Sequence, residues 1–600
     1  MKKLIQAIIL VSVPLSLTDG IGQNDKFGSH AKKGDRCAQE SPRLAAKRDR
    51  TNQYRNQTRY FSDDDSLNRL QDFFQPTLRA NEKHFRGRAG VVKGFGAGRG
   101  YPQIWLRDSA TIIPASSYYY PREFLTTWLE EHLSFQEEDG SLNDWIASGP
   151  RASFLSGAPR AQELYRSRQN QTAGEMITIT ADKNTTEADQ ETSAVDAAYQ
   201  IFRITGDRKW LTKDIRGRTL LKRLDLSIEY LLKARFDVKY GLVTNAFTAD
   251  WGDVSPSYDD QRAIYLDDKT PLVVGLYTNV LVYRAAIELG ELYLTLNQTN
   301  KAEYWKQKAA AIKESINQNL WQEDKGFYRI HIVLTPPRAE HYEDESNLFA
   351  MGGNGLAVLY DVAEETQSRK IFEVAERRQR EFGFSTIAGV LSPSYPGGFF
   401  KHPAVNKEYY YQNGGQWDWF AGRFLLAEFE KGYSARAYRQ LVEIAKKTIA
   451  SNGLYEWHTK DGKGMGSREY AGNAGALAGA VFQGLYGVYL TDRQLGLRIR
   501  LVDQSGQIQL YQPATNKYVE YKYCYSRTSN TVKLVYESNS PGVGRVCVLL
   551  PNNRRLEKVM VEGKKRAFTT IRTGEDTYGC FSTDWKMHQS ELKLAESPQG

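Results

Sequence analysis

The sequence contains few cysteines, four in 600 residues, which excludes a small fold held together by disulfides. Its eight histidines are scattered and show no metal-binding spacing such as HExxH. A P-loop and a GxSxG nucleophile elbow are also missing. The glycine-rich stretch 94–101 does not lead from a strand into a helix, so it does not predict dinucleotide binding. We therefore expect no metal and no cofactor.

Long apolar runs are scarce as well. Leu4–Leu17 is one such run, and it follows two lysines, which is typical of a signal peptide over residues 1–22 and too short for a membrane span. The other long apolar stretch, Pro271–Leu296, is interrupted by polar side chains and predicts a buried helix. We expect a secreted or periplasmic protein with no stable membrane span after signal cleavage.

The positive charge is concentrated near one end of the chain. Lys and Arg number 80 against 71 Asp and Glu, a formal net charge of +9. Residues 23–60 hold ten of the basic and four of the acidic residues, which leaves the rest of the chain close to neutral. This distribution predicts a flexible basic segment over residues 23–60 and argues against a nucleic-acid partner for the folded part.

Residues 61–490 have a mainly helical pattern without the constant period of a repeat solenoid. Nearly continuous apolar stretches alternate with one-faced stretches. An inner ring of buried helices inside an outer ring of half-exposed helices explains this alternation, so we predict an (α/α)6 barrel. The expected helices are Asp63–Leu78, Asp108–Tyr118, Arg122–Glu137, Gln190–Thr205, Arg218–Lys233, Thr270–Leu296, Lys301–Asn319, Asn347–Ala363, Gln367–Phe382, Gln416–Lys431, Ser434–Ser451 and Asn473–Thr491.

Residues 491–600 change to short β-rich stretches separated by turn residues, which predicts a C-terminal antiparallel β-sandwich. The cysteines Cys524, Cys547 and Cys580 lie here, so at most one pair forms among them and Cys37 is left as a fourth partner. The expected strands are Leu495–Leu501, Gln507–Tyr511, Lys517–Tyr525, Thr531–Glu537, Gly544–Leu550, Glu557–Glu562, Ala567–Ile571 and Glu591–Leu594.

A loop after the fifth expected helix contains two candidate catalytic carboxylates. Asp250 and Asp253 flank Trp251 in the sequence TADWGD. Burial against an aromatic wall raises the pKa of a carboxyl group, as a general acid at neutral pH requires. The structural alternative is an Asx-turn loop with a buried tryptophan.

A second candidate carboxylate lies in another loop. Glu456 stands between Tyr455 and Trp457, before a glycine-rich stretch, where it could hold and deprotonate a water molecule. The structural alternative is an ion pair with a nearby Arg or Lys. Glu469 is the second candidate for the base, as Asp250 is for the acid.

Two further motifs combine acidic and aromatic residues at expected helix starts. WLRDSA contains Trp105, Arg107 and Asp108, and an Arg–Asp pair can donate to and accept from neighbouring sugar hydroxyls. NGGQWDWFAG contains Trp417 and Asp418, with indole rings that offer stacking faces for a sugar. The structural alternatives are a helix cap with an Arg–Asp ion pair, and aromatic packing in the core.

Together these motifs resemble the six-hairpin glycosidase superfamily, which includes glucoamylases, amylo-α-1,6-glucosidases, trehalases and processing α-glucosidases. Trp105–Ala110 is similar to the glucoamylase W-x-R-D-S motif, whose Arg–Asp pair binds the first sugar. Ala249–Asp253 resembles T-W-M-D of the debranching enzymes, which implies that Asp253 is the general acid. NGGQWDWFAG followed by Tyr455–His458 resembles the closing third of these barrels, which implies that Glu456 is the general base.

The resemblance covers about residues 100–490 and implies an inverting exo-glycosidase that acts on an oligosaccharide or polysaccharide. An α-glucoside is the expected substrate, with an α-mannoside or an α-L-rhamnoside as alternatives, because WLRDS also occurs in exo-α-mannosidases of this barrel. The residues expected to bind the sugar are Trp105, Arg107, Asp108, Asp250, Trp251, Trp417, Asp418 and Trp457.

Three other functions stay open at this point. A phosphorylase would use phosphate in place of a carboxylate base, and the candidate base at Glu456 argues against it. A non-catalytic carbohydrate-binding protein predicts that Asp253 and Glu456 lie outside one cleft. A polysaccharide lyase would need a proton-abstracting group, for which the tyrosine-rich segment around Tyr409–Tyr411 is a candidate.

Overall fold

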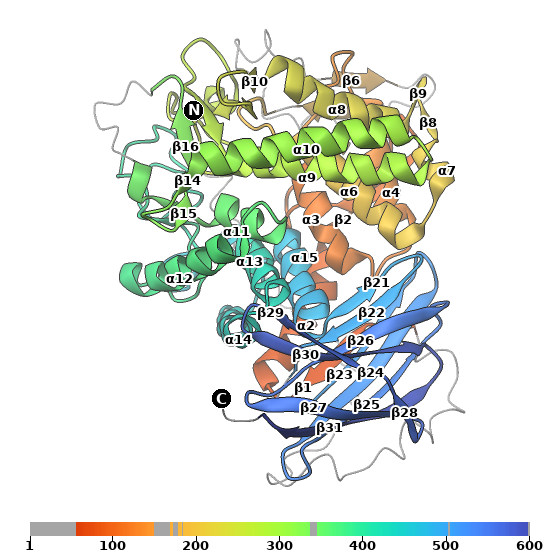
Figure 1. Cartoon of the computed structure of the whole chain (residues 1–600). Helices are drawn as coiled ribbons and strands as arrows, with labels where there is room; N and C mark the ends of the chain where they lie inside the picture. Colours follow the sequence, from red (N-terminus) through yellow and green to blue (C-terminus); the bar gives the residue numbers. More distant parts are fainter. Residues whose placement is uncertain are drawn as a thin grey trace, which may run out of the picture.

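Helices dominate the chain up to residue 485 and strands dominate after it (Figure 1). The computed structural model describes residues 56–148, 168–171, 178–182, 184–336, 345–501 and 505–597. The expected signal peptide and nearly all of the expected flexible segment, including Cys37, lie outside these residues. A mainly helical chain with a β-rich C-terminal region is therefore confirmed.

Every helix expected from the sequence is present, and α6 and α14 have the expected ends. A short helix, α7 (Arg208–Leu211), was not expected. The other helices are α2 (Asp65–Ala80), α3 (Leu106–Ser116), α4 (Glu123–Ser134), α6 (Gln190–Thr205), α8 (Leu220–Ala234), α9 (Leu276–Thr295), α10 (Thr299–Leu320), α11 (Met351–Leu359), α12 (Glu365–Phe382), α13 (Asp418–Glu430), α14 (Ser434–Ser451) and α15 (Ala471–Gly479).

Several expected helices are shorter than predicted, among them α9 and α15. The stretch from Thr270 begins as strand β13 (Leu272–Gly275), which pairs with β12 (Asn245–Ala246) and β16 (His331–Val333), and α9 starts only after it. The stretch from Asn473 continues from α15 into a π-helical turn and then enters strand β21 (Val488–Leu490). In the first place pairing with distant strands replaces helix, and in the second a hairpin of β21 with the following strand β22 (Leu495–Ile499) does so.

The buried helices contact one another in a closed order. Contacts run from α3 to α6, α9, α11, α13 and α15, and α15 contacts α3 again. The intervening helices show one apolar face. In α10, for example, Trp305, Ile312 and Ile316 are buried against α9, which lies alongside it (Figure 1). The nearly continuous apolar stretches of the sequence thus correspond to the helices of the closed order, and the one-faced stretches correspond to the intervening helices.

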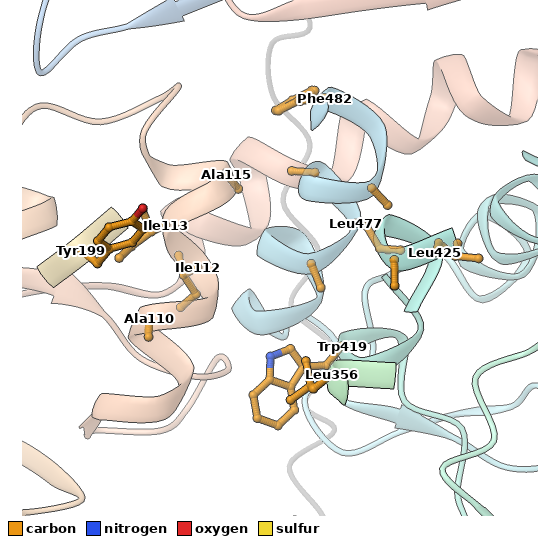
Figure 2. Close-up of a cluster of buried hydrophobic side chains, with 14 of the residues drawn as sticks. Ala110, Ile112, Ile113, Ala115, Tyr199, Leu356, Trp419, Leu425, Leu477 and Phe482 are labelled. Atoms are coloured by element: carbon orange, nitrogen blue, oxygen red, sulfur yellow. The ribbon is translucent and has the colours of Figure 1, made fainter. Parts of the chain in front are cut away.

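Side chains from these buried helices meet in one core. Figure 2 shows Ile112 and Ala115 of α3, Leu425 of α13 and Leu477 of α15 among them. Helix α15 is rich in glycine and alanine, and it packs closely on α3. A Cβ atom at Gly475 would overlap the carbonyl oxygen of Thr111. The small residues of α15 therefore set the distance between the two helices.

The C-terminal region forms two sheets. The larger one begins with β1, so Arg59 and Tyr60, expected in the flexible segment, are part of this sheet. The strand order of the larger sheet is β1 (Arg59–Ser62), β23 (Gly506–Gln512), β24 (Lys517–Ser526), β25 (Thr531–Ser538), β31 (His588–Glu596), β27 (Arg554–Val561) and β28 (Lys564–Arg566). The strand order of the smaller sheet is β21, β22 (Leu495–Ile499), β26 (Val543–Leu549), β30 (Asp576–Asp584) and β29 (Thr569–Thr573). The Tyr536 hydroxyl donates to Thr583 Oγ1 at 2.7 Å and so joins the two sheets.

Two features of these sheets differ from the expectation. Strands β22 and β26 pair in parallel, whereas a wholly antiparallel arrangement was predicted. Strand β30 was not predicted, because its sequence DTYGCFSTD is rich in turn-forming and small residues. It is nevertheless paired on both sides, and Cys580 in it forms a disulfide with Cys547 of β26. Cys524 is also disulfide-bonded.

Within the described part of the chain, no helix has the length and apolarity that crossing a membrane requires.

The tight contact of α15 with α3 predicts opposite effects of two matched substitutions. Gly475→Ala should lower the melting temperature, because the new methyl group forces α3 away at a cost of about 1–3 kcal/mol. Gly479→Ala on the same helix should be neutral or stabilising, because its Cβ would lie 3.7 Å from Pro114 and alanine favours the helix by about 1 kcal/mol. Thermal unfolding of both variants checks this, and an equal decrease in both would contradict it.

Candidate active site

Three short strands and the loops that follow them position the first candidate residues. Strand β4 (Ile104–Trp105) leads directly into α3, and it pairs with β5 (Trp145–Ser148), which pairs with β7 (Thr178–Asp182). The backbone N–H of Leu106 also donates to the carbonyl of Asp144 at 2.8 Å. The start of α3, with Arg107 and Asp108, is therefore fixed beside Asp144.

Arg107 forms ion pairs that the sequence did not predict. Its Nη1 lies 3.1 Å from Glu187 Oε1 and 3.2 Å from Asp189 Oδ2, and it donates to the Trp251 carbonyl at 3.2 Å. The guanidinium also lies over the Trp251 ring, 5.6 Å from its centroid. Arg107 thus joins the start of α3 to the segment before α6 and to the loop that carries Asp253.

Asp108 is held by a tyrosine and not by its neighbour Arg107. The Tyr470 hydroxyl donates to Asp108 Oδ1 at 2.6 Å. Asp108 lies within the first turn of α3, whose N-cap residue is Trp105, so Asp108 does not cap the helix. The charge of Asp108 also acts on Tyr101 and on Glu456, which places it beside the candidate base.

The backbone of Asp253 is fixed from two directions. Its carbonyl accepts hydrogen bonds from Asn184 Nδ2 at 3.0 Å and Thr186 Oγ1 at 2.9 Å, and its N–H lies 3.4 Å from Gln412 Oε1. Its carboxyl oxygen Oδ1 is buried and has no hydrogen-bond partner among the described residues. The side chain is therefore free to act on a bound molecule.

Glu456 is buried, and donors surround its carboxyl group. Ser467 N–H and the Tyr101 hydroxyl donate to Oε2 at 3.2 and 3.1 Å, and the Tyr411 hydroxyl donates to Oε1 at 3.4 Å. Burial raises the pKa of Glu456 to about 7, although the Ser467 N–H and the Tyr101 hydroxyl oppose the shift. Glu456 therefore changes protonation near neutral pH.

The charges of both candidate carboxyl groups act on Tyr101 and Tyr411. Burial raises the pKa of Tyr101, and the carboxylates of Glu456 and Asp253 raise it further. The same causes raise the pKa of Tyr411. Since the charges of both carboxyl groups act on both hydroxyls, Asp253 and Glu456 lie in the same neighbourhood of Tyr101 and Tyr411.

Two further carboxyl groups, missed in the sequence, lie at this pocket. Burial raises the pKa of Asp144 and of Glu187 well above their usual ranges, although Arg107 opposes both shifts. The charge of Asp253 raises the pKa of both groups, so they lie in its neighbourhood. Glu187 and Asp189 precede α6, and acidic residues are common before the start of a helix. The sequence pattern therefore did not indicate that they belong to a site.

The second candidate acid, Asp250, is bound through one carboxyl oxygen, whereas its Oδ1 has no hydrogen-bond partner among the described residues. Asp250 Oδ2 accepts from the N–H of Gly353, in the first turn of α11, at 3.1 Å. Burial raises the pKa of Asp250 to about 6, although this hydrogen bond opposes the shift. Asp250 also lines a small cavity together with Glu187, Asp189 and Trp251, and neither Asp253 nor Glu456 lines it. The second candidate base, Glu469, lies 3.7 Å from the exposed Arg99.

The tryptophans predicted to bind sugar divide into two groups. Trp105 is half-buried and its ring lies 5.2 Å from that of Tyr101, at the pocket. Trp251 and Trp417 pack against each other at 4.7 Å and are almost fully buried, as the structural alternative predicted. Trp457 is buried too, against Tyr410 at 4.5 Å. Of the four, Trp105 is the one with an accessible face.

Asp418 is not brought to the pocket. Its Oδ1 forms an ion pair with Lys447 Nζ at 2.6 Å, and both side chains are buried. We expected Asp418 to bind sugar, but the structure places it in the core, where Lys447 compensates its charge. Among the described residues, no group of His, Cys, Asp or Glu side chains is arranged to hold a metal ion.

Glu456 with its tyrosine donors, the half-buried Asp253, the Arg107–Asp108 pair and the half-buried Trp105 are the kinds of residue that a glycoside hydrolase site requires. The comparison of families supports this class. The model of the mannosylglycerate hydrolase MGH1-like glycoside hydrolase domain matches residues 101–471. Because the match includes more than half of the chain and all the site residues discussed above, the chain belongs to this family of glycoside hydrolase domains.

Solved structures agree on the fold. The α-L-rhamnosidase of Dictyoglumus thermophilum is 13% identical, with a TM-score of 0.57, over 89% of this chain and 50% of its own. The GH78 rhamnosidase of Bacillus sp. GL1 is 14% identical, with a TM-score of 0.52, over 83% and 43%. This chain thus spans about half the length of these rhamnosidases.

A third structure is matched over nearly its whole length. The GH63 mannosylglycerate hydrolase of Thermus thermophilus is 18% identical, with a TM-score of 0.47, over 68% of this chain and 99% of its own. The comparison with curated proteins gives no match.

The ion pairs of Arg107 predict a pH-dependent loss of stability. Arg107→Ala should destabilise the protein by about 3–5 kcal/mol, because it leaves the buried carboxylates of Glu187 and Asp189 without a counter-charge. The loss should be larger at pH 8 than at pH 5, since protonation of Glu187, whose pKa is already raised, removes part of the uncompensated charge. Thermal unfolding at both pH values measures it, with Arg99→Ala as the exposed control. A loss that grows on acidification would contradict the ion-pair assignment.

Proposed function

We propose that the protein is an exported, inverting exo-α-glycosidase in which Asp253 is the general acid and Glu456 is the general base. The observation that carries this proposal is the position of Tyr101 and Tyr411, whose hydroxyls lie in the field of both carboxyl groups. The proposal places a sugar between Asp253 and Glu456 with one carboxyl group on each side, as an inverting displacement requires.

The surroundings of the two groups support this division of roles. Tyr101, Tyr411 and Ser467 donate to Glu456, and such donors favour its ionised form, which is the form that accepts a proton from water. Asp253 Oδ1 has no partner among the described residues and is available to the glycosidic oxygen. In the reaction Asp253 protonates the leaving oxygen while water, deprotonated by Glu456, attacks the anomeric carbon from the opposite face.

The family supports an α-mannoside as the first substrate to test. The sequence motifs alone favoured an α-glucoside, whereas the family is named for hydrolysis of a mannosyl compound. An α-L-rhamnoside is the second candidate, because the structures similar over most of this chain are rhamnosidases. D-Mannose and L-rhamnose share an axial 2-hydroxyl group, and the carboxyl groups of Asp108 and Asp144 at the pocket are acceptors for such a group.

Two further parts of the proposal concern architecture and location. The closed contact order of α3, α6, α9, α11, α13 and α15 supports an (α/α)6 barrel. The disulfide between Cys547 and Cys580 supports export, because disulfides persist in oxidising compartments. The apolar run after Lys2 and Lys3 supports it as well.

The proposal is tested by the loss of either carboxyl group. Asp253→Asn and Glu456→Gln should each lower kcat/KM on an α-mannoside by about 10²–10⁴-fold with unchanged folding. Proton NMR of the first product should show the β-anomer, because inversion converts an α-linkage to a β-sugar. Initial release of the α-anomer would exclude the inverting mechanism.

Matched controls separate these roles from a general effect of removing a buried acid. Glu469→Gln should keep activity near that of the unchanged protein, because Glu469 contacts Arg99 at the surface. Asp324→Asn, at an exposed turn, should do so as well. Full activity in Glu456→Gln with loss in Glu469→Gln would assign the base to Glu469.

The pKa of Glu456 predicts the direction of one limb of the pH profile. A general base must be ionised, so kcat/KM should rise with pH through about 7. Tyr101→Phe should move this limb to higher pH, because it removes a donor that stabilises the ionised carboxylate. Rate measurements between about pH 5 and 9 test both statements. If kcat/KM instead fell on passing pH 7, Glu456 would be the acid.

A further inference from the structure

The outward face of the larger sheet is basic where β25, β31, β27 and β28 lie side by side (Figure 1). Along these strands buried apolar residues alternate with exposed polar ones, as in a sheet with one face in water. The acids on this part of the face are Glu591 and Glu557, the latter at a β-bulge. The exposed basic residues there are Lys533, Arg555, Lys558, Lys565 and Lys593.

Two of these lysines face each other within the sheet. Lys558 of β27 pairs directly with Lys593 of β31. The Cβ atoms of directly opposed residues lie about 4.5–5.5 Å apart, and like charges at that distance destabilise a sheet. Protection of an open sheet edge does not explain Lys593, because β31 is paired with β25 on one side and β27 on the other. An anion bound between the two ammonium groups would remove their repulsion.

The protein itself supplies little counter-charge at this place. Glu591 lies directly opposite Lys533 and can compensate at most that lysine. Among the described residues, the ammonium groups of Lys558 and Lys593 form no ion pair and donate no hydrogen bond to the protein. Their charges are therefore available to an acidic partner.

The other acids of this face lie apart from the lysines. Glu520 of β24 and Glu537 of β25 pair with each other near the opposite end of β25. They accept hydrogen bonds from Gln507 Nε2 at 3.2 Å and from the Tyr518 hydroxyl at 2.8 Å. The sheet face is thus divided into an acidic end, whose carboxylates have protein donors, and a basic end.

The composition of the basic end indicates the kind of partner. The outward residues of these four strands include no aromatic side chain on which a nucleic-acid base could stack. The apolar ones, Val535, Ala595 and Met560, are half-buried, whereas a membrane-binding face needs apolar side chains that insert. Because the chain belongs to a family of glycoside hydrolase domains, a carbohydrate that carries carboxylates fits this face best.

We propose that Lys533, Lys558 and Lys593, with the neighbouring Arg555 and Lys565, form a docking surface for an acidic polysaccharide. The ammonium and guanidinium groups bind its carboxylates and hold the protein on carbohydrate material without taking part in hydrolysis. This inference goes beyond the proposed function and does not depend on the roles of Asp253 and Glu456.

Binding of the full-length protein to polygalacturonate tests the surface. Titration calorimetry should show binding at about 50 mM NaCl that weakens strongly at about 200 mM NaCl, because salt screens exposed charges. Uncharged mannan should not compete for this surface.

One charge reversal separates binding from folding. Lys558→Glu should weaken the affinity for polygalacturonate about tenfold and yet raise the melting temperature, because it replaces a repulsion across the strands with an attraction. Lys593→Gln, which removes one charge without reversing it, should weaken the affinity by a smaller factor. Lys306→Glu, at an exposed position on α10, changes the net charge as Lys558→Glu does and should leave the affinity unchanged.

Several results would overturn this inference. They are a lack of binding at the lower salt concentration, equal affinities of Lys558→Glu and Lys306→Glu, and tighter binding to duplex DNA or to phosphatidylglycerol vesicles than to polygalacturonate. Hydrolysis of 4-nitrophenyl α-mannoside should be the same in the unchanged protein and in these variants. Failure of the docking surface is therefore distinguishable from failure of the proposed function.

Discussion

The buried guanidinium of Arg107 is the interaction on which the site depends. It joins three segments that are far apart in the chain: the start of α3, the Glu187–Asp189 segment and the loop that carries Asp253. A buried positive charge is tolerated only where it is paired, and its partners are themselves buried acids that need it equally. The mutual requirement fixes all three segments, and with them the position of the proposed acid.

The pocket collects more carboxyl groups than one arginine can compensate. Burial and mutual repulsion therefore raise the pKa values of Asp144 and Glu187, whereas Glu456 receives three donors and titrates near neutral pH. Residues of one chemical type thus acquire different properties from their surroundings. Such an acidic, sparsely compensated pocket suits a reaction in which positive charge develops on a sugar ring.

The sequence predicted the helices well, whereas the surroundings of individual aromatic and acidic residues came from the tertiary structure. Helices α6 and α14 have the expected ends because their periodicity is local. Trp417 and Asp418 were expected to bind sugar, yet Trp417 packs on Trp251 and Asp418 pairs with Lys447. An aromatic or acidic residue at a helix start has the same local pattern in both roles, so only its distant neighbours decide between them.

The residues missed in the sequence illustrate the same limit. Tyr101 lies in the glycine-rich stretch before the WLRDSA motif, and Tyr411 lies in a loop that was associated with a different chemistry. Neither has a pattern that predicts contact with Glu456. Strand β30 was missed for a related reason, because pairing with β26 and β29 stabilises a sequence with little strand character of its own.

The sequence by itself determined the helical and β-rich regions, the glycosidase resemblance and the identity of the two carboxyl groups proposed for catalysis, because periodicity and short motifs are local properties. The tertiary structure decided which acids lie near Asp253 and which tryptophan keeps an accessible face. These properties depend on burial and on hydrogen bonds between segments that are distant in the chain, and no local pattern contains them.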